Sequence, residues 1–198
     1  LVANMAASLD IVSGGRLELG LGAGWNEQET EAYGIDLLPM GQRMDRFEEA
    51  VEVIDSLLSH ELTTFQGKYF QLEQARCEPK GPQQPRLPIV IGGGGEKRTL
   101  RIAAKFAQHW NLSFATPEVF RKKNEILLAH CESVGRDSSL IMRSVQIAST
   151  PDQDPAEVAD NAAALFAVGV DQVIFTLRTP YRAERVTALA KSLEAITS

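Results

Sequence analysis

Residues 88–100 read Pro-Ile-Val-Ile-Gly-Gly-Gly-Gly-Glu-Lys-Arg-Thr-Leu, and the rest of the chain is arranged around them. The β-branched run at 89–91 predicts a short strand, and the apolar spacing that begins at Leu100 predicts a helix. Between them lie four glycines, whose backbone can adopt positive φ and approach a ligand closely. A helix N-terminus adds unpaired N–H groups and the positive end of a dipole. This order of strand, glycines and helix predicts a binding site for an anion, most often a phosphate.

The same run has a simpler interpretation as a flexible turn. Four consecutive glycines cost about 0.5–1 kcal/mol each relative to alanine inside regular structure, so a plain turn would need fewer of them. The run is not a Walker A motif, because no Gly-Lys-Ser/Thr ends it. It is not GxGxxG either, because Lys97 stands where the last glycine belongs. We therefore interpret Gly92 to Gly95 as a phosphate site of another kind.

The overall composition excludes several classes of protein. The 198 residues are 44% hydrophobic and 23% charged, as in an ordinary globular domain. A net charge of −6 argues against nucleic acid or an anionic membrane surface as a partner. We see no apolar run of about 18 residues and no signal peptide, so we expect a cytoplasmic protein. Cys77 and Cys131 are expected to be reduced, with one disulfide as the alternative, and the three scattered histidines predict no metal site.

Strands and helices alternate on both sides of the glycine run. The first strand is expected at 16–24, and a small hairpin with Gly67 in its turn is expected between 63 and 72. The run 172–176 has three consecutive apolar residues, Val173-Ile174-Phe175, so we expect a strand buried on both faces. Further strands are predicted at 109–112 and 141–150, and helices at 1–10, 27–33, 41–60, 99–107, 117–133, 155–169 and 181–196.

This alternation predicts an α/β fold with a parallel sheet. A doubly wound sheet can close on five strands, whereas a TIM (β/α)₈ barrel needs eight units and about 250 residues. The helix at 1–10 has no strand before it, which favours a partial TIM barrel of about five units, 1–198, cut from a longer protein. Such a barrel has two unpaired edges, so we expect a homo-oligomer or association through these edges. A catalytically inactive fragment is an alternative of another class.

Three stretches carry a family resemblance: residues 6–27, which contain Gly-Gly-Arg-Leu-Glu-Leu-Gly-Leu-Gly-Ala-Gly-Trp-Asn-Glu, residues 64–70, Thr-Phe-Gln-Gly-Lys-Tyr-Phe, and the glycine run at 91–100. In this order they resemble the luciferase-like monooxygenase superfamily, and specifically its coenzyme F420-dependent oxidoreductases. The resemblance covers essentially the whole chain and implies a TIM-type barrel without its first three βα units. It also implies a cofactor at the C-terminal ends of the strands, where barrel active sites lie.

The resemblance also implies which residues bind the cofactor. The glycine run would hold the cofactor phosphate, and the small residues after the first strand would lie near the ring. Of the family's Asp-Gly-Trp-Asn, the last two residues are present and the first two are replaced by Gln108 and His109. The acid that follows Gly-x-Gly in the sugar-phosphate dehydrogenases is replaced by Trp25. The implied cofactor-binding residues are Gly22, Ala23, Gly24, Gly92, Gly93, Gly94, Gly95, Arg98, Thr99, Trp110 and Asn111.

The implied function is hydride transfer between the deazaflavin F420 and an unidentified small organic substrate. An FMN-dependent monooxygenase is the alternative, because both cofactors share a ring shape and a phosphate arm. No nucleophile–base arrangement can be identified by spacing, so the chemistry is assigned to the cofactor and the catalytic residues stay unknown. His109 is the one candidate, expected at a strand end facing the site, where an imidazole can polarise a carbonyl. A purely structural role for His109 is the other interpretation.

Overall fold

The computed structural model describes residues 1–197, and side-chain surroundings as far as Glu194, so the expected domain end at Ser198 lies outside the described residues. Its centre is a five-stranded sheet in the order β1-β4-β5-β6-β7, with every neighbouring pair parallel. Because this spatial order follows the chain order, the sheet is a section of a barrel wall. The predicted α/β partial barrel is confirmed. The strands are β1 (Leu19–Leu21), β4 (Ile89–Gly92), β5 (His109–Ser113), β6 (Met142–Ser149) and β7 (Gln172–Leu177).

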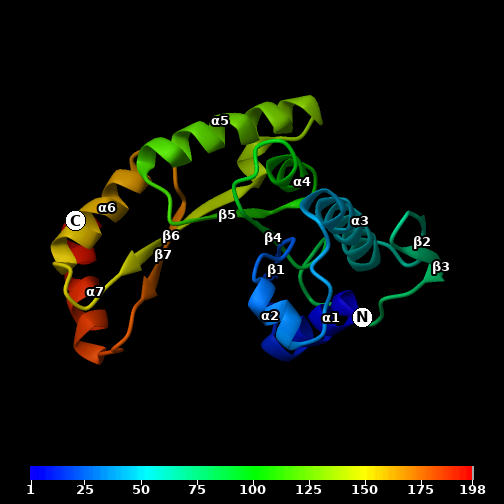
Figure 1. Ribbon diagram of the computed structural model, residues 1–198, viewed down its shortest axis with the longest axis horizontal. Helices are drawn as coiled ribbons and strands as arrows, with labels where there is room; N and C mark the ends of the chain where they lie inside the picture. Colours follow the sequence, from blue (N-terminus) through cyan, green and yellow to red (C-terminus); the bar gives the residue numbers. More distant parts are fainter. Residues whose placement is uncertain (198) are drawn as a thin grey trace.

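Helices cover the convex side of the sheet, and Figure 1 shows them following its curve from α3 to α7. The predicted hairpin is confirmed: β2 (Thr63–Gln66) pairs antiparallel with β3 (Gln71–Ala75), and the pair lies beside α3. None of the described helices is long and apolar enough to cross a membrane. The helices are α1 (Val2–Ser13), α2 (Glu27–Ala32), α3 (Met40–Ser59), α4 (Thr99–Phe106), α5 (Pro117–Ser133), α6 (Pro155–Phe166) and α7 (Ala183–Thr197), with a 3₁₀ turn η1 (Ser138–Leu140).

Several helix ends lie where the capping residues predict them. The Thr116 hydroxyl accepts a hydrogen bond from the Val119 N–H, and the Asp154 carboxylate accepts one from the Ala156 N–H. A proline follows each cap at the first helical position, where its missing N–H is not needed. Gly14 ends α1 in the left-handed conformation with φ of 67°. These local signals account for the close agreement between predicted and observed helices.

The core lies between the convex face of the sheet and the helices. Alternate strand residues such as Ile91, Trp110 and Val145 are fully buried there against Phe120 and Leu165. A second cluster joins α1, α3 and the hairpin. Cys77 and Cys131 are buried free thiols, as expected, and burial raises the pKa of both.

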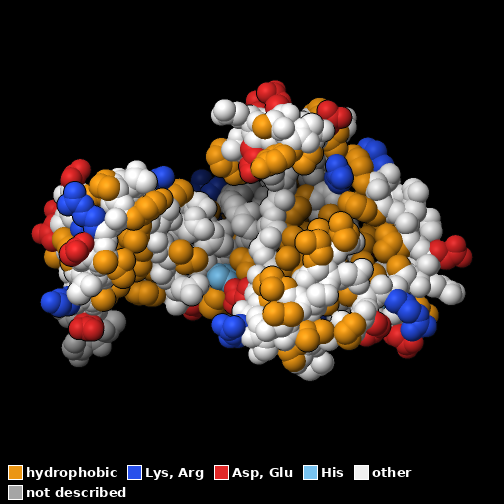
Figure 2. All heavy atoms as spheres, turned by 90° about the horizontal axis from the view of Figure 1, so that it is seen from below, with side chains coloured by type: hydrophobic (Ala, Val, Ile, Leu, Met, Phe, Trp, Pro, Cys, Tyr) orange, Lys and Arg blue, Asp and Glu red, His pale blue; other side chains and the backbone are white. Residues whose placement is uncertain are grey.

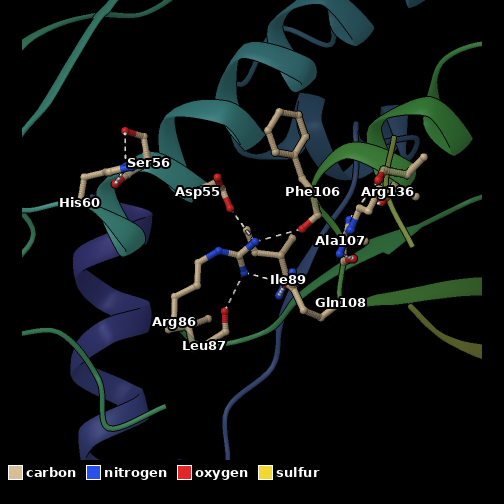
Figure 3. Close-up of polar contacts among 12 residues, drawn as sticks. Asp55, Ser56, His60, Arg86, Leu87, Ile89, Phe106, Ala107, Gln108 and Arg136 are labelled. Atoms are coloured by element: carbon tan, nitrogen blue, oxygen red, sulfur yellow. Dashed lines mark hydrogen bonds and ion pairs between the residues drawn. The ribbon is translucent and has the colours of Figure 1, made fainter. Parts of the chain in front are cut away.

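Two arginines seal the end of the sheet at which β4 and β5 begin. The Arg86 guanidinium forms an ion pair of 2.5 Å with Asp55 and donates to the Gln108 side-chain oxygen at 2.6 Å and to the Phe106 carbonyl at 3.0 Å (Figure 3). The Arg136 guanidinium donates to the Ala107 carbonyl, which follows α4. Burial lowers the pKa of Arg136. Side chains thus satisfy the carbonyls at the end of α4.

Two predicted features are wrong. The first strand is shorter than 16–24, because β4 offers partners only for residues 19–21. The last strand, β7, is not buried on both faces: Gln172 is exposed, and Ile174 is 37% exposed. Within residues 1–197, β1 and β7 each pair on one side only, and Gln172 and Ile174 of β7 line an open groove. An apolar run in the sequence does not reveal whether its strand lies at an edge.

The first helix also exposes an apolar face. Its residues Val2, Met5, Leu9 and Val12, together with Leu19 of β1, line a groove of about 700 Å³. Figure 2 shows hydrophobic side chains gathered on the face seen from below the view of Figure 1. These four side chains of α1 are exposed, so the apolar face of the helix is open in the described part of the chain.

Candidate functional site

The parallel strands end together at one edge of the sheet, and the predicted glycine segments meet at this edge. Leu21 pairs with Ile91, so the next residues, Gly22 and Gly92, lie side by side. Asn111 in turn pairs with Gly92 on the neighbouring strand. The structure therefore brings the small-residue segment, the glycine run and Asn111 to the same level of the sheet.

The glycine run forms a cradle of free backbone donors, which we define as residues 93–96. Gly93 has φ of 114°, and its N–H donates to the Asn111 carbonyl at 2.9 Å. Among residues 1–197, no acceptor receives a hydrogen bond from the N–H of Gly94, Gly95 or Glu96. These three donors precede α4, at the positive end of its dipole. Free N–H groups in this position are suited to bind an anion.

Side chains would not fit in the cradle. A Cβ on Gly94 would lie 2.8 Å from Cδ1 of Leu112, and a Cβ on Gly95 would lie 2.7 Å from Oγ1 of Thr99. Gly93 has a positive φ that residues with a side chain rarely adopt. The cradle therefore favours glycine, at position 93 through its backbone angle and at positions 94 and 95 through the closeness of Leu112 and Thr99. A phosphate group fits a cradle of this kind, since its oxygens need donors and close backbone approach.

A lysine adds positive charge beside the cradle. The Lys123 ammonium lies 2.8 Å from the Glu96 carboxylate, and Lys122 lies 3.8 Å from it. The Lys123 hydrogen bond and charge lower the pKa of Glu96. The Lys123 side chain also passes within 3.7 Å of the position that a Cβ on Gly94 would take. One carboxylate thus faces two ammonium groups, which leaves the cradle surroundings net positive.

The two side-chain candidates beside the cradle differ in placement. Thr99 contacts the cradle: its Oγ1 and Cγ2 lie against Gly95 and Gly93. Arg98 instead turns toward α3, where its guanidinium donates to the Asp45 carboxylate at 2.6 Å. The structure therefore places Thr99, and not the Arg98 guanidinium, at the predicted phosphate position. The sequence could not separate these adjacent residues, because both stand at the start of a helix.

Trp110 supports the cradle from behind the sheet. Its indole is completely buried and stacks on Phe120 with ring centroids 5.7 Å apart. Its Nε1 donates to the Gly93 carbonyl at 2.9 Å. Trp110 thus lies on the convex side and holds Gly93 in place, while Asn111 faces the concave side. Strand alternation explains this division, because successive side chains point to opposite faces.

The segment after β1 is open on the concave side. A Cβ on Gly22 would meet no atom within 4 Å. Ala23 packs against the core instead. Gly24 has φ of 79°, and its carbonyl accepts a hydrogen bond of 2.9 Å from the Arg43 guanidinium. Of the three predicted residues, Gly22 therefore offers the surface that a ligand ring could approach.

His109 differs from its predicted placement. It begins β5, opposite the predicted strand end, and it is 5% exposed. Its Nδ1 lies 2.8 Å from the Glu18 carboxylate, and its Nε2 lies 2.6 Å from the Ser144 hydroxyl. The Asn111 amide nitrogen donates to the same hydroxyl at 2.7 Å. Both ring nitrogens thus have protein partners, and His109 belongs to a polar chain that joins Glu18, just before β1, to residues of β5 and β6.

Sequence analysis missed Glu18 and Ser144. They lie 91 and 35 residues from His109 along the chain, so no local spacing connects them. Their signal is weak: Glu18 stands between Leu17 and Leu19 just before β1, and Ser144 lies on a strand that also carries Arg143 and Gln146. The interiors of (β/α)₈ barrels are filled mainly by branched apolar residues. A polar interior in this chain is therefore a departure that points to a role.

Comparison with known proteins identifies the family to which the chain belongs. A model of the luciferase-like monooxygenase family matches residues 1–196. The pyrimidine monooxygenase RutA of Agrobacterium fabrum is 30% identical over 161 residues, which are 78% of this chain and 43% of that protein. The F420-dependent glucose-6-phosphate dehydrogenase of Kineococcus radiotolerans is 31% identical over 164 residues, which are 81% of this chain and 47% of that protein. The chain spans less than half the length of these two relatives.

A solved structure shows the same fold. An F420-dependent secondary alcohol dehydrogenase in complex with an F420–acetone adduct superposes with a TM-score of 0.86 at 18% sequence identity. The superposition covers 98% of this chain and 74% of that chain. At this identity the likeness concerns the fold alone.

Proposed function

This chain belongs to the luciferase-like monooxygenase family, and from that premise we propose that it binds coenzyme F420 in an oxidoreductase acting on a small organic substrate. The observation that carries the proposal is the cradle of three free N–H groups at Gly94, Gly95 and Glu96. It lies at the C-terminal edge of the parallel strands, where barrel enzymes bind their ligands. The relatives include an F420-dependent dehydrogenase, which supports the choice of cofactor.

The residues of this chain would bind and orient the cofactor. The three cradle N–H groups would donate to the phosphate, and the Lys123 ammonium would add charge nearby. Gly22 and Gly92 present no side chain, so a flat ring could lie against their backbone. When bound, the deazaflavin supplies the hydride chemistry, and the protein contributes binding, orientation and electrostatics.

FMN is the second candidate, with monooxygenase activity. The likeness to the pyrimidine monooxygenase over 161 residues favours it specifically. FMN also carries a phosphate arm, so the cradle supports both cofactors equally. The distinction rests on the ring and the substrate, and not on the phosphate.

Titration separates the two proposals. F420 and FMN are each added to the purified chain, and ring fluorescence is followed to saturation. We expect F420 to bind at least tenfold more tightly than FMN. Binding of FMN alone would overturn the F420 proposal, and binding of neither would overturn the cofactor site. For the cradle variant Gly95→Ala, Gly41→Ala is the matched control, because a Cβ on Gly41 of α3 would meet no atom within 4 Å.

We also propose that copies of the chain associate through the free edge of β1 and the apolar face of α1. The groove lined by Val2, Met5, Leu9 and Val12 supports this proposal. Light scattering after size-exclusion chromatography is expected to give a dimer or larger species. A cooperatively melting monomer at all concentrations would contradict it.

A further inference from the structure

The concave face of the sheet holds a groove of about 410 Å³ beside the cradle, with Asn111 among its lining residues. The Asn111 side chain is 9% exposed, and its amide nitrogen donates to the Ser144 hydroxyl at 2.7 Å. Its other polar atom, Oδ1, accepts no hydrogen bond from any described residue, yet it is not enclosed by protein atoms. A largely buried amide therefore presents a free acceptor to the groove.

The direction of this amide follows from the chain behind it. The Glu18 carboxylate can only accept, so the Nδ1 of His109 carries the proton that joins them at 2.8 Å. In the neutral imidazole, Nε2 is then an acceptor and takes the single hydroxyl proton of Ser144 at 2.6 Å. In this arrangement the Ser144 oxygen accepts from the Asn111 amide nitrogen, in agreement with the 2.7 Å hydrogen bond between them. Each bond fixes the next, and Oδ1 is left for a ligand.

A complementary donor lies on the neighbouring strand. Gln146 of β6 pairs with Ser113, two residues beyond Asn111 on β5. The Gln146 side-chain oxygen accepts from the Ser113 hydroxyl at 3.3 Å, which leaves its amide nitrogen free toward the groove. The groove thus presents an acceptor on β5 and a donor on β6, two residue positions apart in the register of the two strands. Gly92, which pairs with Asn111, connects it to the cradle without an intervening side chain.

We propose that this groove binds the imide edge of a heterocycle, with Asn111 Oδ1 accepting from the ring N–H and the Gln146 amide donating to an adjacent carbonyl. Glu18, His109 and Ser144 are positioning residues that act through Asn111. An imide edge of this kind occurs in the ring of F420 or FMN and in a pyrimidine substrate. As a site for the cofactor ring, the inference rests on the proposed function. As a site for a pyrimidine substrate, it does not depend on that function.

Paired probes with and without the imide proton test the inference on the full chain. Uracil is compared with 3-methyluracil by calorimetry, and the cofactor that binds is compared with its N3-methylated form by fluorescence. We expect methylation to weaken binding at least tenfold in one arm, because it leaves Asn111 Oδ1 without a donor. Discrimination in the uracil arm alone identifies a substrate site, and discrimination in the cofactor arm alone identifies a ring site. Equal binding of parent and methylated probes in both arms would overturn the inference.

Ser144→Ala tests the positioning chain. Losing the hydroxyl frees the Asn111 amide to rotate, so the ratio of parent to methylated affinity should fall below about threefold. The exposed Ser139→Ala is the control and should keep the full ratio. Glu18→Gln is the second variant, because Glu18 is 44% exposed and the change is isosteric. It should reduce the ratio while the melting temperature stays unchanged; a full ratio in both variants would refute the positioning role.

The tests separate this inference from the proposed function. If the cofactor binds but methylation has no effect in either arm, the imide site is wrong and the cradle stands. If no cofactor binds but uracil is discriminated from 3-methyluracil, the proposed function fails and the groove remains a pyrimidine site.

Discussion

The two ends of the β4–α4 unit differ in how their backbone groups are satisfied. At the start of β4, Arg86 and Arg136 donate to carbonyls around the end of α4, and Asp55 neutralises Arg86 in a largely buried ion pair. At the end of β4, three successive N–H groups of the cradle donate to no described residue. Residues 87–93 thus separate Arg86, at the saturated end, from Gly94, the first free donor of the open end.

This difference indicates that the start of β4 and the apolar core stabilise the β4–α4 unit, whereas the cradle is kept open for binding. Unsatisfied backbone groups weaken a structure unless water or a ligand binds them. The open end can therefore be kept for binding only because the other end and the apolar core hold the unit in place. (β/α)₈ enzymes divide their two faces in the same way, with function at the C-terminal face and stability at the other.

The largest predicted effect is at the saturated end. Arg86→Ala removes the ion pair and leaves Asp55, 27% exposed, beside unpaired carbonyls. Breaking a buried pair from one side costs about 3–5 kcal/mol, and we expect the free energy of unfolding to fall by about this amount. Urea denaturation measures it. Arg76→Ala is the control, since its pair with Glu61 is exposed on both sides and should contribute less than about 1 kcal/mol. Equal losses for the two variants would remove the distinction between the ends.

The next effect is at the open end. Gly95→Ala places a methyl group 2.7 Å from the Thr99 hydroxyl and so narrows the cradle. We expect the affinity for the cofactor to fall at least tenfold, with a loss of unfolding free energy of about 1–2 kcal/mol at most. Fluorescence titration and urea denaturation of the same samples separate the two. Gly41→Ala should leave the affinity unchanged. If Gly95→Ala binds the cofactor like the wild type, the cradle is not the phosphate site.

A smaller effect on stability is predicted for a set of backbone N–H groups that already have an acceptor within the protein. The Glu49 carboxylate accepts from the N–H groups of Lys68, Tyr69 and Phe70 at 3.0, 2.8 and 3.2 Å. Partial desolvation raises the pKa of Glu49, but the three donors together lower it by a larger amount. The net pKa of Glu49 therefore lies below its usual value. Residues 68–70 thus bind a carboxylate through three backbone N–H groups, in the way that we propose for a phosphate in the cradle.

The pH dependence follows from the sign of this shift. A carboxyl group with a lowered folded-state pKa stabilises the protein above its unfolded pKa, and this contribution is lost as pH falls through the folded value. The urea midpoint of the wild type should therefore fall more steeply below about pH 4.5 than that of Glu49→Gln. Glu52→Gln, exposed on the same helix, is the control and should follow the wild type. Parallel curves for the wild type and Glu49→Gln would contradict the assignment.

Much of the fold could be predicted from sequence because its signals are local. The caps at Thr116 and Asp154 and the glycine run each act within a few residues. The burial of β7 was predicted wrongly, because the sequence does not specify what covers Ile174. The meeting of Glu18, just before β1, with His109 of β5 and Ser144 of β6 depends on the strand order and on the β5–β6 register, which no local pattern specifies. Side chains alternate between the two faces of a strand, so the opposite orientations of Trp110 and Asn111 on β5 could have been predicted. Sequence analysis did not use this signal.

The most direct test of the cradle compares each cofactor with its phosphate-free counterpart. Riboflavin is titrated beside FMN, and the deazaflavin ring without its phosphate arm is titrated beside F420, with ring fluorescence as the readout. Charge-assisted hydrogen bonds contribute about 1.5–3 kcal/mol each, so removal of the phosphate should weaken binding at least tenfold. In Gly95→Ala this difference should shrink to less than threefold. Equal affinity of the wild type for phosphorylated and phosphate-free forms would contradict the account.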